Sequence, residues 1–364
     1  MSPRKRVPLI VFGLGGVGRA FLEQVLQRRD YHARHYGLRL EVVGLADSDG
    51  AAVAPGGLSD DQLQTAIRHK EKGGRLATLP FAYYQNDVRS LVDLEATAQT
   101  VVVDMTASDA TYPALLLARE RKASVVLANK LPLTRPLQEA RPLFEYPRLR
   151  YETTVGAALP VITTTKRLAA SGETIQRVVG SLSGTLGYIM TAVEEGVAFS
   201  KAVLRAKELG YTEPDPREDL SGRDVARKGL ILARTLGWDI EMDDVKVQSL
   251  FPEEWASWPL PAFLGELYAL DDDFYSWRDA AQVRHESLRY VVQVSEGTVQ
   301  VGIQFIPSDS PLGRLRGSDN LVEFYTQYYD PQPLAIQGRG AGVHATAAGV
   351  LSDIMELCLF PQVP

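Results

Sequence analysis

VPLIVFGLGGVGRAFLEQVLQ, residues 7–27, is the stretch that decides the fold of this 364-residue chain. Its apolar start predicts a short buried strand over residues 7–12, and the run from Arg19 predicts a helix. Between them lies a G-x-G-x-x-G turn, in which glycines allow a tight bend, close approach of a pyrophosphate and helix–strand packing. With the amides at the helix start, the turn predicts a dinucleotide site, the alternative being a plain glycine turn. The predicted cofactor-binding residues of this turn are Gly13, Gly15, Gly16, Val17 and Gly18.

Three more apolar segments, LEVVGLA, VVVDM and SVVLA, predict further buried strands, and a polar residue follows each of them. Ligands of open parallel sheets bind at the carboxyl ends of the strands. We therefore predict an α/β fold with a Rossmann-type doubly wound parallel sheet. Its strand ends contribute four more candidate cofactor-binding residues, Asp47, Thr106, Ala107 and Lys130.

Asp47 bears on the choice of cofactor. A carboxylate after the second strand can bind the adenosine ribose hydroxyls and repel a 2′-phosphate. This slightly favours NAD, while Ser48 and nearby arginines leave NADP open. The alternative is that Asp47 simply forms the turn in ADSDG.

A second informative stretch is GYTEPDPREDLSGRDVARKGLIL, residues 210–232, which places the acids Glu213, Asp215, Asp219 and Asp224 and the lysine Lys228 around two prolines. Ser221 or Gly222 is the expected N-cap of a helix. Asp224 and Lys228 are spaced i,i+4 at the edge of the apolar face, which indicates a polar cleft at the core margin. The alternative is an exposed ion pair of little energetic value.

The same helical wheel predicts which side of this helix meets solvent. Arg223, Arg227 and Arg234 fall on one side, expected to be exposed, and Val225 and Gly229 fall on the side expected to face the core.

The rest of the chain predicts a second domain. Residues 288–294 and 299–305 alternate apolar and polar side chains around Glu296-Gly297, which predicts an antiparallel hairpin. A long helix is expected over residues 344–357. We predict a Rossmann domain over residues 1–150, a mixed α/β substrate and dimerisation domain over 151–335, and a C-terminal segment, 336–364, that returns to the first domain.

Composition sets the broad class. A net charge of −6 without a basic run argues against nucleic-acid binding. No segment approaches the apolar length of a membrane span, and no signal peptide is evident. A single cysteine, Cys358, fits a reducing compartment, so the expectation is a cytoplasmic enzyme.

Taken together, several stretches resemble homoserine dehydrogenases: GLGGVG, ANK at residues 128–130, YETTVGAALPVI, GSLSGTLGYI, GYTEPDPREDLSGRDVARK and GRGAGVHATAAGVLSDI. The resemblance implies NAD(P)-dependent interconversion of L-homoserine and L-aspartate 4-semialdehyde, on the route to threonine, isoleucine and methionine. It also implies a homodimer, in a short form without an ACT or aspartate kinase domain. Gly187 departs from the family pattern, where Asn or Ser is more usual.

The resemblance also carries residue roles. It assigns catalysis to Lys228, with Lys130 as a second lysine of the site. It assigns substrate binding to Glu213 and Asp224, with Asp219 beside them, and a place near the nicotinamide to Gly340. It assigns a monovalent cation, Na⁺ or K⁺, to a loop containing Glu152, Val155, Ala157 and Leu159. From position alone, we add Thr185 and Tyr188 as binders of the amino-acid end of the substrate.

Other functions fit the residues less well. Oxidation of the aldehyde to an acyl phosphate needs a cysteine nucleophile, and Cys358 lies in an apolar terminal helix. A histidine base is the next option, with His344 the one candidate near a motif. A catalytically silent NAD(P) sensor would have no need of paired lysines and acids.

Overall fold

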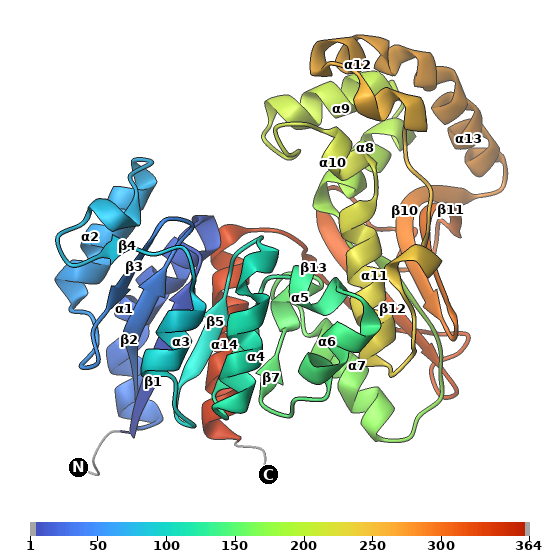
Figure 1. The fold of residues 1–364 in the computed structure, drawn as a ribbon. Helices are drawn as coiled ribbons and strands as arrows, with labels where there is room; N and C mark the ends of the chain where they lie inside the picture. The colour runs from blue at the N-terminus through green and yellow to red at the C-terminus, as the bar shows by residue number, and fades with distance from the viewer. Residues whose placement is uncertain (1–4, 361–364) are drawn as a thin grey trace. The chain divides into compact units, whose positions relative to one another are not determined.

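The structure is a computed structural model that describes residues 5–360. Its internal contacts divide the chain into two compact units (Figure 1). The first contains residues 1–158 and 342–364, and the second contains residues 159–341. The boundaries lie further along the chain than we predicted, because the segment after residue 150 packs on the first unit and strand β13 belongs to the sheet of the second.

The first unit is built on a seven-stranded sheet with the order β4-β3-β2-β1-β5-β6-β7. Strands β2, β1, β5, β6 and β7 are parallel, and β3 runs antiparallel between β2 and β4. The strands are β1 (Lys5–Phe12), β2 (Leu38–Ala46), β3 (Gly50–Val53), β4 (Tyr83–Tyr84), β5 (Val101–Asp104), β6 (Ser124–Leu127) and β7 (Leu149–Arg150). This confirms the doubly wound parallel sheet, and the ribbon of β3 and β4 is an addition that the sequence did not signal.

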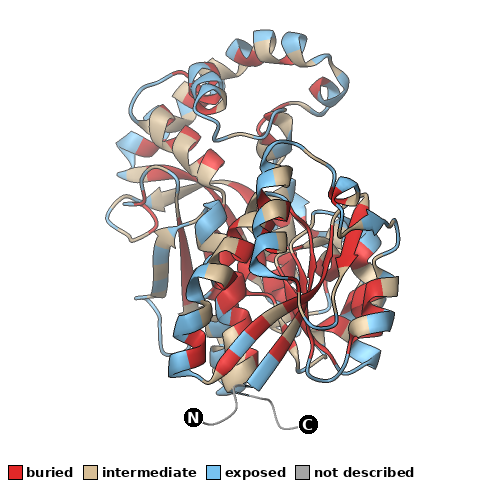
Figure 2. Cartoon of the chain, turned by 90° about the vertical axis from the view of Figure 1, so that its left-hand side faces the viewer, coloured by how far each residue is buried: buried red, intermediate tan, exposed pale blue. Residues whose placement is uncertain are grey.

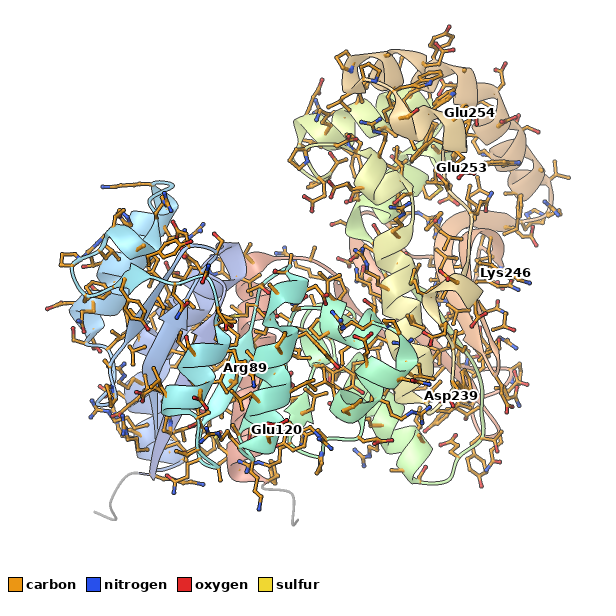
Figure 3. All side chains as sticks on the ribbon, viewed as in Figure 1. Arg89, Glu120, Asp239, Lys246, Glu253 and Glu254 are labelled. Carbon is orange, nitrogen blue, oxygen red and sulfur yellow. The ribbon has the colours of Figure 1, made fainter. Side chains whose placement is uncertain are left out.

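Helices cover both faces of this sheet. Helices α1 and α14 pack against each other, and α3 packs against α4. Most of the strands are buried, except β4, whose two tyrosines are exposed, and the helices expose one side (Figure 2). The helices are α1 (Gly16–His35), α2 (Asp60–Glu71), α3 (Arg89–Glu95), α4 (Tyr112–Glu120), α5 (Leu131–Thr134), α6 (Leu137–Phe144) and α14 (Val343–Leu359), with 3-10 turns η1 (Leu76–Thr78), η2 (Asp109–Thr111) and η3 (Glu152–Thr154). In Figure 3, Arg89 and Glu120 extend from the exposed sides of α3 and α4.

The second unit is built on a six-stranded sheet with the order β13-β12-β8-β10-β11-β9. All its neighbours are antiparallel except β9, which runs parallel to β11. The strands are β8 (Ile175–Ser181), β9 (Lys246–Val247), β10 (Glu286–Ser295), β11 (Thr298–Pro307), β12 (Asp319–Thr326) and β13 (Leu334–Arg339). The predicted hairpin is confirmed as β10 and β11, with Ser295 paired to Thr298 at the turn.

Helix α11 lies on this sheet, against β10 and β11. A Cβ atom at Gly229 would come within 2.5 Å of Val292 and 2.8 Å of Val299, so only glycine allows this close packing. The helices of the unit are α7 (Val161–Ala170), α8 (Gly184–Glu194), α9 (Phe199–Glu208), α10 (Arg217–Leu220), α11 (Arg223–Thr235), α12 (Leu260–Glu266) and α13 (Asp271–Val283), with 3-10 turns η4 (Met242–Asp244), η5 (Glu253–Ser257) and η6 (Leu267–Leu270).

One predicted exposure on α11 is wrong. Arg223 is exposed, but the side chain of Arg234 is only 1% exposed. Its guanidinium donates to the carbonyl of Ile240 at 3.0 Å and to the carboxylate of Glu241 at 2.9 Å. The segment that follows α11 folds back over this part of the helix and covers a position that the wheel placed in solvent.

Within residues 5–360, no helix combines the length and the apolar character needed to cross a bilayer.

Candidate functional site

The carboxyl ends of four parallel strands lie in one row at the edge of the first sheet. Phe12 pairs with Ala46 of β2 and with Asp104 of β5, and Asp104 pairs with Leu127 of β6. These residues lie one to three positions before the predicted cofactor residues Gly13, Asp47, Thr106 and Lys130. The structure therefore brings Gly13, Asp47, Thr106 and Asn129-Lys130 to the same edge, as the sequence predicted.

The glycine turn has two packing positions and one open position. Gly13 has φ +95°, and a Cβ atom there would lie 2.9 Å from the backbone of Met105. A Cβ atom at Gly18 would lie 1.9 Å from the carbonyl oxygen of Gly13, whereas at Gly15 no described atom lies within 4 Å of one. Gly13 and Gly18 are thus required by the fold, while Gly15 leaves space beside the backbone for a ligand.

The start of α1 suits an anion. Gly15 is the N-cap and supplies no side-chain hydrogen bond to the helix. The first intrahelical bond joins the amide of Arg19 to the carbonyl of Gly15, so the amides of Gly16, Val17 and Gly18 are the donors that a helix start leaves for a phosphate. The open position and these donors fit the pyrophosphate of a dinucleotide.

Asp47 forms the turn, which is one of the two roles that the sequence left open, and it also carries an ion pair. One carboxylate oxygen accepts the amides of Asp49 and Gly50 at 3.1 and 3.0 Å, which makes it a turn former. The other oxygen lies 2.6 Å from the ammonium of Lys70. Hydrogen bonding with Asp47, followed by the Arg75 guanidinium, lowers the pKa of Asp49. Two cations therefore face two carboxylates at the end of β2.

The ends of β5 and β6 are joined by a buried polar network. Asp104 accepts the amide of Thr106 at 2.9 Å and its hydroxyl at 2.7 Å. It also accepts the hydroxyl of Thr111 at 2.6 Å and the side-chain amide of Asn129 at 3.0 Å. Lys130 follows directly and caps the start of α5. Asp104 and Asn129 were not among the predicted site residues.

The predicted cation loop turns sharply after η3. Gly156 and Ala157 have φ values of +82° and +56°, so the backbone reverses there. Glu152 is buried, and its amide donates to Asp353 of α14 at 3.1 Å. Burial, followed by the charge of Glu152, raises the pKa of Asp353 to about 8.

A cation bound in this loop would need oxygen ligands that do not come from a cluster of side chains. Within residues 5–360, no group of three or more His, Cys, Asp or Glu side chains could hold a metal ion. A monovalent ion bound through backbone carbonyls, as predicted with Val155 and Leu159, needs no such group, and the assignment stays a prediction.

In the second unit, Lys228 occupies the margin of the core as predicted. Its ammonium lies 2.8 Å from the carboxylate of Asp224 and donates to the carbonyl of Leu182 at 2.6 Å. Its side chain is 13% exposed, and that of Asp224 is 46% exposed. Gly222, with φ +71°, is the N-cap that starts this helix. The carboxylate of Asp224 and the carbonyl of Leu182 therefore hold the ammonium of Lys228 in one position.

The acidic loop lies beside this lysine. The carboxylate of Asp219 accepts the amide of Glu213 at 2.8 Å. Burial raises the pKa of Asp219, although hydrogen bonds from Glu213 and Thr185 oppose the shift. The charges of Glu213 and Asp224 act on the same carboxyl group. Three acids thus concentrate negative charge, which suits a ligand with an ammonium group.

Asp215 has a structural task in the same loop. It forms a bidentate pair with Arg217, which lowers the pKa of Asp215. Arg217 also donates to the carbonyls of Ala256 and Trp258 at 3.0 and 2.6 Å. This pair fastens the loop to the segment around η5.

Helix α8 brings the other two predicted substrate residues to this loop. The hydroxyl of Thr185 donates to the carbonyl of Tyr211 at 2.5 Å. The ring of Tyr188 meets the ring of Tyr211 edge to face at a centroid distance of 5.1 Å. At Gly187, a Cβ atom would lie 2.8 Å from the carbonyl oxygen of Gly317, which explains why this chain carries glycine there.

The turn near Gly340 rests on a buried asparagine. The amide of Asn320 donates to the carbonyl of Gly340 at 3.3 Å, and Asn320 is fully buried. A Cβ atom at Gly340 would overlap the Asn320 side chain, at 1.9 Å from its Cγ. Asn320 is a third residue that the sequence reasoning missed.

The missed residues had only faint signals. Asp104 was visible as one charged residue inside an apolar strand, VVVDM, a pattern that indicates a buried and satisfied carboxylate. Asn129 directly follows a predicted strand and Asn320 lies outside the strands that the sequence predicted, so neither differs from an ordinary loop residue.

Family comparisons match both units. A model described as homoserine dehydrogenase, NAD binding domain, matches residues 13–151. A second, described as homoserine dehydrogenase, matches residues 160–355. Together they cover the glycine turn, the acidic loop and α11.

Whole-chain comparisons agree. A homoserine dehydrogenase of Emericella nidulans is 35% identical, over 95% of this chain and 97% of its own length. A bifunctional aspartokinase/homoserine dehydrogenase of Haemophilus influenzae is 34% identical over 97% of this chain, which spans only 43% of that relative. The solved structure of a hyperthermophilic archaeal homoserine dehydrogenase in complex with NADPH superposes with a TM-score of 0.75 at 25% identity, covering 99% of this chain and all of that one.

Proposed function

Because this chain belongs to the homoserine dehydrogenase family, we propose that it interconverts L-homoserine and L-aspartate 4-semialdehyde with NAD(P). The observation that carries the proposal is the arrangement around Lys228, whose ammonium is held by Asp224 and Leu182 beside the acidic loop. The reaction would serve the synthesis of threonine, methionine and isoleucine.

Lys228 is the proposed proton-transfer group. An ammonium has three N–H donors, and two of them have partners among the described residues, the Asp224 carboxylate and the Leu182 carbonyl. The third is available for the oxygen that is a carbonyl in the aldehyde and a hydroxyl in the alcohol. Donation stabilises the charge that develops on this oxygen during reduction, and the neutral amine accepts the proton in the reverse direction. The nicotinamide supplies or takes up the hydride.

The acidic loop is the proposed site for the substrate ammonium. Glu213 and Asp219 present carboxylates next to each other, and Thr185 and Tyr188 border them from α8. Lys130 is proposed as the second lysine of the site, placed by the Asn129 side chain at the end of β6. The cation loop at Glu152, Val155, Ala157 and Leu159 is proposed to hold Na⁺ or K⁺.

The chemistry has a direct test. Purified protein, shown to be folded by circular dichroism, is mixed with L-homoserine and either NAD or NADP, and the absorbance band of the reduced nicotinamide is followed. We expect its growth with at least one cofactor. A folded protein without turnover in either direction would overturn the proposal.

Cofactor choice is proposed to depend on the Asp47–Lys70 pair. Asp47 slightly favours NAD through the ribose hydroxyls, and Lys70 with Arg75 offers positive charge to a 2′-phosphate. The solved structure of the archaeal relative is a complex with NADPH, so both cofactors belong in the test. Asp47→Ala should weaken NADH binding and strengthen NADPH binding, measured by fluorescence titration of each. The matched variant Lys70→Ala should do the reverse, and parallel changes for the two cofactors would contradict this assignment.

A homodimer in the cytoplasm completes the proposal. On β11, Ile303, Phe305 and Ile306 are only partly buried, next to the short edge strand β9. Such an apolar edge suits contact with a second copy of the chain. Light scattering after size-exclusion chromatography should give twice the chain mass. The cytoplasmic location rests on composition and the single cysteine, whose thiol pKa is raised by burial.

A further inference from the structure

Asp104 is a buried carboxylate that the proposed reaction leaves without a task. It ends β5 and is fully buried. Four donors meet its two oxygens: the amide and hydroxyl of Thr106 on one, and Thr111 and Asn129 on the other. All partners are neutral, so this is not an ion pair. Burial raises the pKa of Asp104, and the hydrogen bonds from Thr111, Thr106 and Asn129 oppose that shift.

The partners of Asp104 control two loops at the cofactor edge. Asn129 donates to the carbonyl of Ser108 at 2.7 Å and accepts the amide of Leu131 at 3.1 Å. The backbone carbonyl of Asp104 accepts the amides of Ala128 and Asn129 at 2.9 and 3.2 Å. One residue of β5 thereby fixes both the loop of residues 106–108 and the backbone on either side of Lys130.

The position of β5 in the sheet indicates which part of the cofactor would lie against the loops held by Asp104. Dinucleotides bind across the point where strand order reverses, which here is β1. The β2 side, with Asp47, takes the adenosine half. The β5 and β6 side therefore receives the nicotinamide half, where hydride transfer occurs.

We propose that Asp104 is a positioning residue for the nicotinamide half of the cofactor and for Lys130. This inference rests on the proposed dehydrogenase function. An aspartate is suited to the place because an ionised carboxylate only accepts hydrogen bonds. An asparagine of the same size would direct an N–H₂ group at donors, and the loops would separate from each other.

The test uses Asp104→Asn and two readouts that a general loss of structure would move together. Misplacing reacting groups by about 1 Å can cost about 10²-fold, so we expect kcat/KM to fall by about that factor. ADP-ribose, which lacks the nicotinamide, should bind the variant as it binds the parent protein, measured by calorimetry. Retained kcat/KM would overturn the inference, and so would a loss of ADP-ribose affinity equal to the loss of kcat/KM.

A control substitution next to the other end of β5 distinguishes a positioning role from an effect on stability alone. Thr100 is also fully buried in the first unit, where its side chain bonds Thr97 and Glu95. Thr100→Val should lower the melting temperature while leaving kcat/KM unchanged. An equal fall of kcat/KM in this control would overturn the inference.

If Asp104→Asn does not fold, the variant Thr111→Val tests the inference in its place. It removes one donor to Asp104 and keeps the other three, so kcat/KM should fall by about 10-fold with ADP-ribose binding retained. Unchanged kcat/KM would overturn the inference. Failure of the proposed function is a separate result, because it would appear as an inactive parent protein.

Discussion

The site residues predicted from the sequence fall into two halves, one in each unit, and the two halves are built in different ways. In the first unit, each residue follows a different parallel strand, and the register of β2, β1, β5 and β6 brings the four ends together. In the second unit, Lys228, Asp224, Asp219 and Glu213 come from one stretch of chain, held by short-range contacts. A strand-end site depends on the whole sheet, whereas a loop-and-helix site depends on a few contacts. The two halves should therefore respond separately to substitution.

The largest effect is expected from Lys228→Ala. Loss of a positioned proton-transfer group typically costs 10²–10⁴-fold, and kcat should fall within roughly that range. NAD(P)H affinity, measured by fluorescence titration, should stay the same, because the glycine turn is in the other unit. The exposed Lys201 of α9 is the matched control, and Lys201→Ala should keep full activity. A large loss of cofactor affinity in Lys228→Ala would break the separation of the halves.

A pair of substitutions in the glycine turn tests the other half. At Gly15, where no described atom lies within 4 Å of an added Cβ, alanine should leave the melting temperature unchanged. It should weaken NAD(P)H binding by about 10-fold, since it obstructs charge-assisted bonds to the pyrophosphate. At Gly18, with only 1.9 Å to the Gly13 carbonyl, overpacking should cost about 1–3 kcal/mol of stability. Thermal unfolding and calorimetry measure both. Equal losses of stability in the two variants would contradict the assignment of Gly15 to the ligand.

The sequence predicted the first half of the site more completely than the second. Strand ends of a parallel sheet follow a general rule, so Gly13, Asp47, Thr106 and Lys130 could be placed at one edge without coordinates. The rule could not predict which ion pairs form at that edge. The Lys70–Asp47 contact joins helix α2 to the end of β2, and no local pattern encodes it.

In the second unit, local periodicity located the Asp224–Lys228 pair but misplaced Arg234. A helical wheel describes only positions within one helix. The side chain of Arg234 is covered by Ile240 and Glu241, which follow the helix after a turn. Gly187 shows the same limit, since its cause is the carbonyl of Gly317, distant in sequence. The surroundings of Arg234 and Gly187 depend on contacts with segments outside their own helices. The pattern of a single sequence does not reveal these contacts.

The smallest effect is expected from the pH dependence of Asp219→Asn. Because burial raises the pKa of Asp219 in the folded protein, the folded state holds this proton at pH values where the unfolded chain has lost it. The stability from this group is present below the unfolded pKa and is lost as pH rises through the folded value. Asparagine does not titrate, so the melting temperature of the variant should gain on that of the parent protein as pH rises from about 4 towards neutrality. Thermal unfolding at several pH values measures this. A gap that stays constant or moves the other way would show that the hydrogen bonds from Glu213 and Thr185 outweigh burial.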